Sequence, residues 1–437
     1  MMKNIFSQGR RIAKNGNRIL LWLFTLVLIG CQDLNFTDPN DPTLDNPPSV
    51  QKLVTGIEAG MRIDYAIYLR VVEIFGRQVY YLEPADPRYT GELLRGPIDA
   101  GGFLLNRPWG SRYRVVKNCA QLLALPAERE VNEAGKRAFA NTIIAHQLLL
   151  NLNLTYDNGV KIVFSDDVST PFVSRDASYA EIARLLDSAD GDLAIAITQG
   201  DDFGFKLSSG FAGFNKPSTF RQFNRALRAR VAVYQKDYNA ALTALGNSFL
   251  NTGASLQVGV YHVYSAGAND QVNETWEDPS AESIRLVAHP SFRAEAAPGD
   301  TRFSTKTVVR DTIFFDNLSS NLAVNILASS TDRLPLIRNE ELILLRAEAN
   351  IGLNQLGAAE ADINQFIRQP AGLGAITLTP ANALDQLLYE KRYSLFMEGH
   401  RWIDVRRYDK LGTLPLDRGG DIRVPFTPRP ESEVTGG

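Results

Sequence analysis

Apolar residues recur every three to four positions through much of the chain, a spacing that predicts amphipathic helices rather than strands. Ser49 is suited to cap the first helix, because its hydroxyl can accept a hydrogen bond from the first helical turn. The apolar face of that helix consists of Val50, Leu53, Val54, Ile57 and Met61. Further helices are predicted at 109–125, 128–155 and 178–197, with a turn at 157–159.

Two later segments, 217–249 and 338–368, predict helix–turn–helix hairpins. They can be laid over each other, with Arg228 matching Arg346 and with small residues following in both copies. Small residues on facing helices and a bulky residue at the turn, here Tyr238, allow the close helix approach that is typical of tetratricopeptide repeats. A generic antiparallel helix pair would explain either copy alone, but their recurrence favours tetratricopeptide-like packing.

The segments 251–337 and 75–108 lack a helical period and are rich in turn-forming and aromatic residues. Within the first of them, 308–309 and 312–315 combine β-branched and aromatic residues, which predicts short strands. We therefore expect an irregular, partly β subdomain inserted into a helical body.

The expected fold class is mostly α. A tetratricopeptide-like body of helical hairpins is placed at about 109–250 and 338–410. The irregular segments at about 75–108 and 251–337 are the parts expected to face a ligand.

The N-terminus carries five basic residues ahead of an apolar run at 19–29, which is too short to span a bilayer and suits a signal peptide. The run ends Leu28-Ile29-Gly30-Cys31, which resembles the bacterial lipobox. That resemblance implies that residues 1–30 are removed and that Cys31 becomes a lipidated first residue. An ordinary secretory signal with a chance cysteine, or a short anchor helix, are the alternatives.

Residues 31–48 predict a flexible tether, because Asp, Asn and Pro dominate the stretch and disfavour both helix and strand. Gln32, rather than Asp, follows the cysteine. In the sorting of Gram-negative lipoproteins an Asp at that position retains the protein in the inner membrane, so Gln32 is compatible with the outer membrane.

Net charge and cysteine content exclude some classes of function. Without the basic residues of 1–30 the formal net charge changes from −3 to about −8, so a nucleic-acid partner is not expected. A composition of 44% hydrophobic and 22% charged residues indicates a globular chain. Cys119 is the only cysteine besides Cys31, and its helical surroundings predict a buried, inert thiol.

No catalytic residue, cofactor or metal set is expected from the sequence. Glu398, His400 and Asp404 are close together, but their spacing fits no standard metal motif, and the other histidines are scattered. Basic residues stand nearby in similar number, which predicts a structural ion-pair network locking the last helix to the hairpins. Its expected cations are Arg392, Arg401, Arg406 and Arg407.

The C-terminal motifs resemble the SusD/RagB family. Residues 335–349, PLIRNEELILLRAEA, are similar to its "P-x-IR-xxE-xxL-xxAEA" hairpin, and 388–392 with 398–407 are similar to its "ExRxxE…EGxRxxDLRR" ending. Residues 109–118 resemble its "W-xxx-Y-xx-I-xx-N" helix, with the Asn displaced by one position. The signature is carried by Arg338, Glu341, Glu348, Arg392, Glu398, Arg401, Asp404 and Arg407.

The resemblance implies a SusD-like domain at 49–437 and a surface lipoprotein of a Gram-negative outer membrane. Such a protein binds a nutrient, often a glycan, and sits as a lid on a SusC-like TonB-dependent barrel. A tetratricopeptide-type lipoprotein scaffold for outer-membrane assembly and a helical surface glycosidase are the alternatives. The glycosidase would need paired carboxylates across a cleft, and no pair can be nominated.

Flat aromatic rings beside polar groups suit the apolar faces and hydroxyls of sugars. Two irregular stretches, 78–95 and 261–276, offer them, although aromatic residues in loops are as often local core. The candidate ligand-binding residues are Tyr80, Tyr81, Arg88, Tyr89, Tyr261, Tyr264, Asn273 and Trp276. Trp109 and Trp402, which stand inside family-like motifs, are expected to be structural.

Overall fold

The computed structural model describes residues 49–162 and 170–434. The expected signal peptide, the lipidated Cys31 and the tether up to residue 48 lie outside these residues. In the described part, the first helix is α2 (Val50–Arg62), and Ser49 caps it as expected by accepting a hydrogen bond from the Lys52 amide at 3.3 Å.

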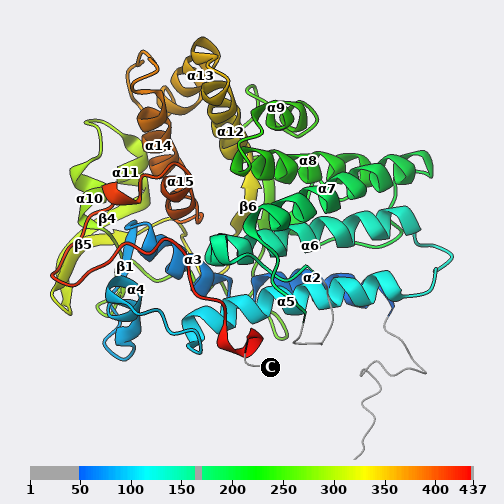
Figure 1. Cartoon of the computed structure of the whole chain (residues 1–437), viewed down its shortest axis with the longest axis horizontal. Coiled ribbons are helices and arrows are strands. Elements are labelled where there is room, and N and C mark those ends of the chain that lie inside the picture. Colours follow the sequence, from blue (N-terminus) through cyan, green and yellow to red (C-terminus); the bar gives the residue numbers. More distant parts are fainter. Residues whose placement is uncertain (1–48, 163–169, 435–437) are drawn as a thin grey trace, which may run out of the picture. The chain divides into compact units, whose positions relative to one another are not determined.

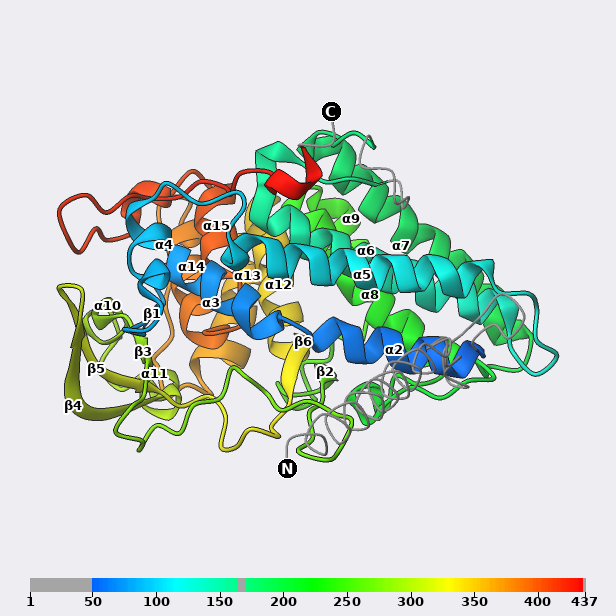
Figure 2. The same cartoon turned by 90° about the horizontal axis from the view of Figure 1, so that it is seen from below.

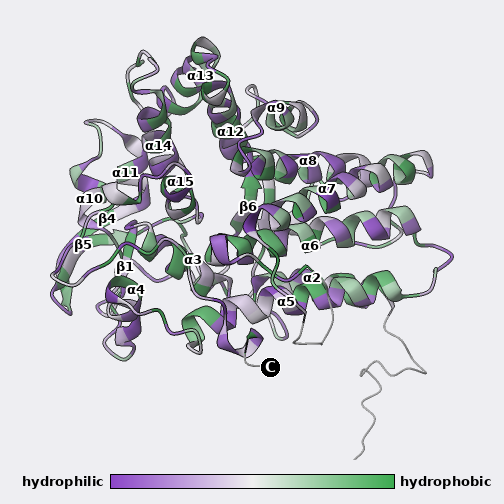
Figure 3. Cartoon of the chain, viewed as in Figure 1, coloured by the Kyte–Doolittle hydropathy of each residue, from purple (hydrophilic) through white to green (hydrophobic). Residues whose placement is uncertain are grey.

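A run of antiparallel helices forms the body (Figure 1). Each packs on the next in the series α5, α6, α7 and α8, and α2 lies along α5. Their bounds are α5 (Phe103–Ala124), α6 (Glu133–Thr155), α7 (Arg175–Thr198) and α8 (Pro217–Tyr234). Hydrophobic and hydrophilic bands run side by side along these helices (Figure 3), which is the amphipathic pattern that the sequence spacing predicts.

Two helix starts differ from the sequence prediction. Helix α5 begins at Phe103 rather than 109, with Pro108 inside it. Pro108 lacks an amide and leaves one hydrogen bond unmade, a loss the helix tolerates because ten of its residues are buried. Helix α6 begins at Glu133 rather than 128, because the Asn132 side chain caps it by accepting from the Gly135 amide at 2.9 Å.

The second hairpin packs against the first. Helix α12 (Asn339–Gly352) contacts α8 and α9 (Tyr238–Gly246), and its partner α13 (Leu356–Asp362) continues into a π-helical turn at Ile363–Arg368. The chain ends in α14 (Ala383–Ser394), α15 (Arg401–Arg407) and an extended tail with short 3₁₀ turns.

Gly352 lets the two hairpins approach closely, because a Cβ added there would overlap the ring of Tyr238. Replacing Gly352 with alanine is therefore expected to lower the free energy of unfolding by about 1–3 kcal/mol. Gly357→Ala is the matched control, since nothing lies within 4 Å of the added methyl group and alanine favours a helix. Urea denaturation of both variants measures the difference, and equal stabilities would remove the proposed role of the glycine.

The β structure comes from segments far apart in sequence. A four-stranded antiparallel sheet has the order β1–β3–β5–β4. Its strands are β1 (Val79–Tyr81), β3 (Leu286–Ala288), β5 (Leu318–Val324) and β4 (Thr307–Phe315). The expected strand residues 308–309 and 312–315 lie in β4. The short helices near it are α3 (Tyr65–Phe75), α4 (Glu92–Arg95), α10 (Pro290–Ala294) and α11 (Thr301–Lys306).

A separate strand pair lies between the helical body and the four-stranded sheet (Figure 2). It consists of β2 (Gly259–His262) and β6 (Leu334–Arg338), antiparallel and with a register shift between Val260 and Tyr261. The fold class expected from the sequence is confirmed: the chain is mostly α, built on helical hairpins with a small β part. Across the described ranges, no helix has the length and apolar content needed to cross a membrane.

Candidate functional site

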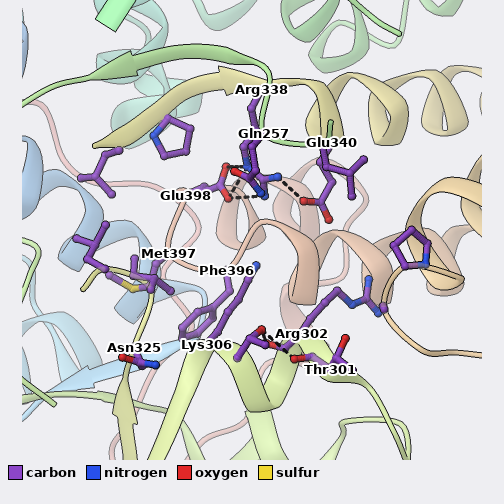
Figure 4. A pocket seen from close by; sticks show the side chains of 18 of the residues that line it. Gln257, Thr301, Arg302, Lys306, Asn325, Arg338, Glu340, Phe396, Met397 and Glu398 are labelled. Carbon is purple, nitrogen blue, oxygen red and sulfur yellow. Dashed lines mark hydrogen bonds and ion pairs between the residues drawn. The ribbon is translucent and has the colours of Figure 1, made fainter. Parts of the chain in front are cut away.

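Two cavities flank the β2–β6 pair, and Tyr261 lines both. Cavity 1, of about 380 Å³, lies between β6, α11 and residues 396–398 (Figure 4). Cavity 2, of about 430 Å³, lies between α2, β2 and residues 206–208. Both volumes fall in the range of small-molecule sites.

The wall of cavity 1 includes paired charges (Figure 4). Arg338 donates to Glu398 at 2.7 Å and pairs with Glu340. Burial alone would raise the pKa of Glu340, but the charges of Arg338 and Lys306 outweigh it and hold that pKa below its usual value. The Lys306 ammonium donates to the carbonyls of Tyr393 and Ser394, and burial lowers its pKa to about 8.

Cavity 2 mixes polar side chains with aromatic rings. Arg62 pairs with Asp270 at 2.7 Å, and both carboxylate oxygens of Glu58 accept from the Ser208 amide at 3.1 Å. Burial raises the pKa of Glu58 despite these hydrogen bonds. Gln51 closes one side by accepting from the Lys206 amide at 2.7 Å.

His262 gives cavity 2 a buried polar atom with no partner. The Nε2 atom of its ring makes no hydrogen bond to any residue in the described part of the chain. Burial holds the pKa of His262 far below its ordinary value, so the ring is neutral. A buried ring nitrogen left unpaired costs free energy, so it is a natural contact for a ligand or a bound water.

The candidate residues of 261–276 divide between the cavities and the core. Tyr261 borders both cavities, and the Arg333 guanidinium lies 4.0 Å from its ring centre. Tyr264 is half-buried with Arg62 over its ring at 5.8 Å. Asn273 is buried and fixes the loop by accepting from the Thr275 amide and donating to the Asp332 carbonyl. Trp276 is half-buried against the core.

The candidates of 78–95 lie elsewhere. Tyr80, Tyr81 and Tyr89 are buried in the core, and the last two meet edge to face with ring centres 4.6 Å apart. Arg88 is exposed and pairs with Asp86 at 2.7 Å. None of the four lines cavity 1 or cavity 2. Their segment contributes strand β1 instead.

Sequence reasoning missed most of the lining of both cavities. Glu58, Lys206 and His262 come from three separate stretches, and Lys306 from a fourth. No spacing in the sequence links them, because they meet only through packing. The one available signal was the polar pair Asn269 and Asp270, in a loop that the sequence favours for binding.

The family-like signature residues lie largely in buried ion pairs. Glu348 and Asp404 share Lys391 and Arg407, with the four nitrogen–oxygen distances between 2.6 and 2.9 Å. Glu341 pairs with Arg230 at 2.6 Å. These contacts join α12, α14, α15 and α8, so their role is to hold the body together.

The expected network needs one correction. Arg392 pairs with Glu295 and Arg407 with two carboxylates, as anticipated. Arg401 and Arg406 instead donate to main-chain carbonyls, of Gly76 at 3.1 Å and of Asn153 at 2.9 Å. Neither has a carboxylate within ion-pair distance in the described part, because both face the ends of secondary-structure elements with free carbonyls.

The remaining expectations concern the two tryptophans in the family-like motifs, the cysteine Cys119 and metal binding. Trp109 and Trp402 are both buried in the core, and the Trp402 indole donates to the Val424 carbonyl at 2.7 Å. Cys119 is buried, and burial raises the pKa of its thiol. Among residues 49–162 and 170–434, no three His, Cys, Asp or Glu side chains are grouped to hold a metal ion.

Residues 296–423 match the sequence model of the SusD family. The fold resembles a SusD-like carbohydrate-binding protein from Bacteroides vulgatus, with a TM-score of 0.61, 16% identity and coverage of 82% of this chain and 83% of that one. Surface glycan-binding protein A from Bacteroides thetaiotaomicron matches with a TM-score of 0.66 and 14% identity, covering 88% of this chain and 96% of that one. A laminarin-binding SusD-like protein matches with a TM-score of 0.55 and 16% identity, covering 87% of this chain and 97% of that one. No curated protein sequence matches significantly.

Proposed function

We propose that this chain, whose residues 296–423 match the sequence model of the SusD family, is a surface lipoprotein that binds a glycan and delivers it to a SusC-like TonB-dependent barrel. The proposal is supported by the fold shared with a surface glycan-binding protein and a laminarin-binding protein. Peptides and other polymers are the competing nutrients.

We place the glycan in cavity 2. The observation that carries this placement is the unpaired, buried His262 Nε2 in a wall that also holds Arg62, Asp270 and the Tyr261 ring. Sugars need hydrogen-bonding groups around an aromatic or apolar face, and this wall supplies both. Cavity 1 is less suited, because no side chain of its described lining has a buried polar atom that lacks a hydrogen-bond partner.

The anchor belongs to the same proposal. A thioether lipid on Cys31 would hold the chain at the outer membrane, and residues 32–48 would space the body from the lipid surface. Metabolic labelling with a clickable fatty acid tests this step, and Cys31→Ser is expected to abolish the label.

Glycan binding is tested by calorimetry with laminarin and a panel of other oligosaccharides. Asn269 has a φ of +67°, which glycine adopts freely, so Asn269→Gly removes the amide without straining the loop. We expect this variant to weaken glycan binding about tenfold. Asn325→Ala in cavity 1 is the matched control, and a loss confined to Asn325→Ala would contradict the placement in cavity 2.

The transporter role is tested by a gentle detergent pull-down from native outer membrane followed by mass spectrometry. A large TonB-dependent barrel in near-equal amount is the expected result. Recovery of assembly factors without a barrel would overturn the delivery role and favour the scaffold alternative.

A further inference from the structure

A third cavity, of about 500 Å³, lies on the helical side of the molecule. It is formed where the 3₁₀ turn Tyr156–Asn158, the start of α7, the end of α8 and the end of α15 meet. Its lining shares no residue with cavity 1 or cavity 2. The side chains that matter below are Tyr156, Arg175, Tyr179, Tyr234, Lys236 and Arg407.

Two buried polar groups on this wall have no hydrogen-bond partner in the described part of the chain. One is the Tyr179 hydroxyl, on a side chain only 3% exposed, and the other is Arg407 Nε. The terminal nitrogens of Arg407 already donate to Glu348, Asp404 and the Val233 carbonyl. An unpaired buried donor costs free energy, so each of these two groups would gain from an acceptor placed in the cavity.

The cavity also carries positive charge beside aromatic rings. Lys236 is exposed, and no carboxylate of the described residues lies within ion-pair distance of it. Arg406 lies 4.0 Å from the centre of the Tyr156 ring, and Arg175 lies 4.9 Å from it. Arg175 is balanced by Asp157 and Asp176, and Arg407 pairs with Glu348 and Asp404, so the excess positive charge on the cavity lining rests on Lys236.

We propose that this helical-side cavity is a second binding site and that its ligand is a sugar acid, a hydroxylated ring bearing one carboxylate. The carboxylate would accept from the Tyr179 hydroxyl and Arg407 Nε, and Lys236 would add long-range attraction. The tyrosine rings suit the apolar face of a sugar ring. A singly charged group fits better than phosphate, because Asp157, Asp176, Glu348 and Asp404 offset most of the nearby cations.

The inference stands apart from the delivery role proposed above, because it rests on a different cavity and needs no transporter. If the protein binds a sugar acid but the pull-down recovers no barrel, the delivery role is overturned and the proposal of this second site still stands.

Calorimetry of the intact protein with D-glucuronate, D-glucose and inorganic phosphate at equal ionic strength tests the site. Glucuronate is expected to bind more tightly than the other two. Tyr179→Phe should weaken glucuronate binding about tenfold or more, since a hydrogen bond to a charged group is lost. Its melting temperature should be unchanged or higher, because the ring remains and an unpaired hydroxyl is removed.

Two further variants complete the test. Lys236→Asn keeps a residue that tolerates the positive φ of 60° and should weaken glucuronate several-fold, whereas the exposed Lys52→Gln on α2 should not. The proposal is overturned by no glucuronate binding, by equal binding of glucose, by tighter binding of phosphate, or by full affinity in Tyr179→Phe. Equal losses of glucuronate affinity in the Lys52 and Lys236 variants would mean that the lysines attract the anion only non-specifically. That result would also overturn the proposal.

Discussion

Replacing Glu348 with alanine is expected to lower the free energy of unfolding by about 3–5 kcal/mol, because it leaves buried cations without their partner. The Glu348 carboxylate has no exposed surface and pairs with Lys391 at 2.9 Å and Arg407 at 2.6 Å. After its removal only Asp404 would remain to balance two cations. Chemical denaturation at neutral pH measures the loss.

The loss of stability caused by Glu348→Ala should become smaller as the pH falls. Burial alone would raise the pKa of Glu348, but Arg407 and Lys391 outweigh it and hold that pKa below its usual 4.5. The stabilisation from this carboxylate is therefore complete above pH 4.5 and is lost as the pH falls through the lower pKa of the folded state. The gap between wild type and Glu348→Ala should narrow over that acidic range.

Glu181→Ala is the matched control. Glu181 pairs with Arg184 at 2.6 Å on the surface of α7, where the arginine side chain is 62% exposed. Such pairs contribute at most about 1 kcal/mol. If Glu348→Ala lowered the free energy of unfolding no more than Glu181→Ala does, the buried ion-pair cluster would not be what stabilises the packing of α12 against α14 and α15.

The second large effect is expected at Glu73, where glutamine should stabilise the protein at alkaline pH. Glu73 is 1% exposed, one carboxylate oxygen accepts from the Gly399 amide at 2.6 Å, and the other has no partner in the described residues. Burial raises the pKa of this carboxyl to about 8. The folded protein therefore keeps Glu73 protonated while the unfolded chain ionises from pH 4.5 upward.

The higher pKa of Glu73 in the folded protein sets the direction of the pH dependence of stability. Wild type loses stability as the pH rises from 4.5 to about 8, because ionisation favours the unfolded chain. Glu73→Gln keeps the acceptor for Gly399 and cannot ionise, so at pH 8 it should be more stable than wild type by about 4 kcal/mol. Near pH 4.5 the two proteins should be alike.

Glu340→Gln provides the opposite case. Its carboxylate is also buried, but Arg338 and Lys306 favour the ionised form, so the amide should destabilise the protein at pH 8. A destabilised Glu73→Gln at pH 8 would mean that Glu73 is ionised in the folded protein and paired with a nearby cation such as Arg401.

The helical body could be anticipated because its signals are local. Apolar spacing placed α2 and the hairpins, and the residue type of Ser49 indicated the cap of α2. Each of these depends on residues within one helix or one hairpin. The helix starts at Phe103 and Glu133 were less predictable, because burial offset Pro108 and Asn132 selected the cap.

The candidate sites could be anticipated only in part. Tyr261 and the loop at 269–270 were within a nominated stretch, and both reach cavity 2. Tyr80 and Tyr89 looked equally suited by composition, yet β1 pairs with β3 and draws its segment into the core. Composition alone does not distinguish a tyrosine that lines a cavity from one that packs under a sheet.

The sequence by itself determined the helical hairpins and the family-like motifs, since each depends on neighbouring residues or fixed spacings. Tertiary structure alone decided the β1–β3 pairing, the sharing of Lys391 and Arg407 by two carboxylates, and the three cavities. The physical reason is range: helices form from contacts within a few positions, whereas His262, Glu58 and Lys206 meet only after hydrophobic burial has fixed the packing of distant elements.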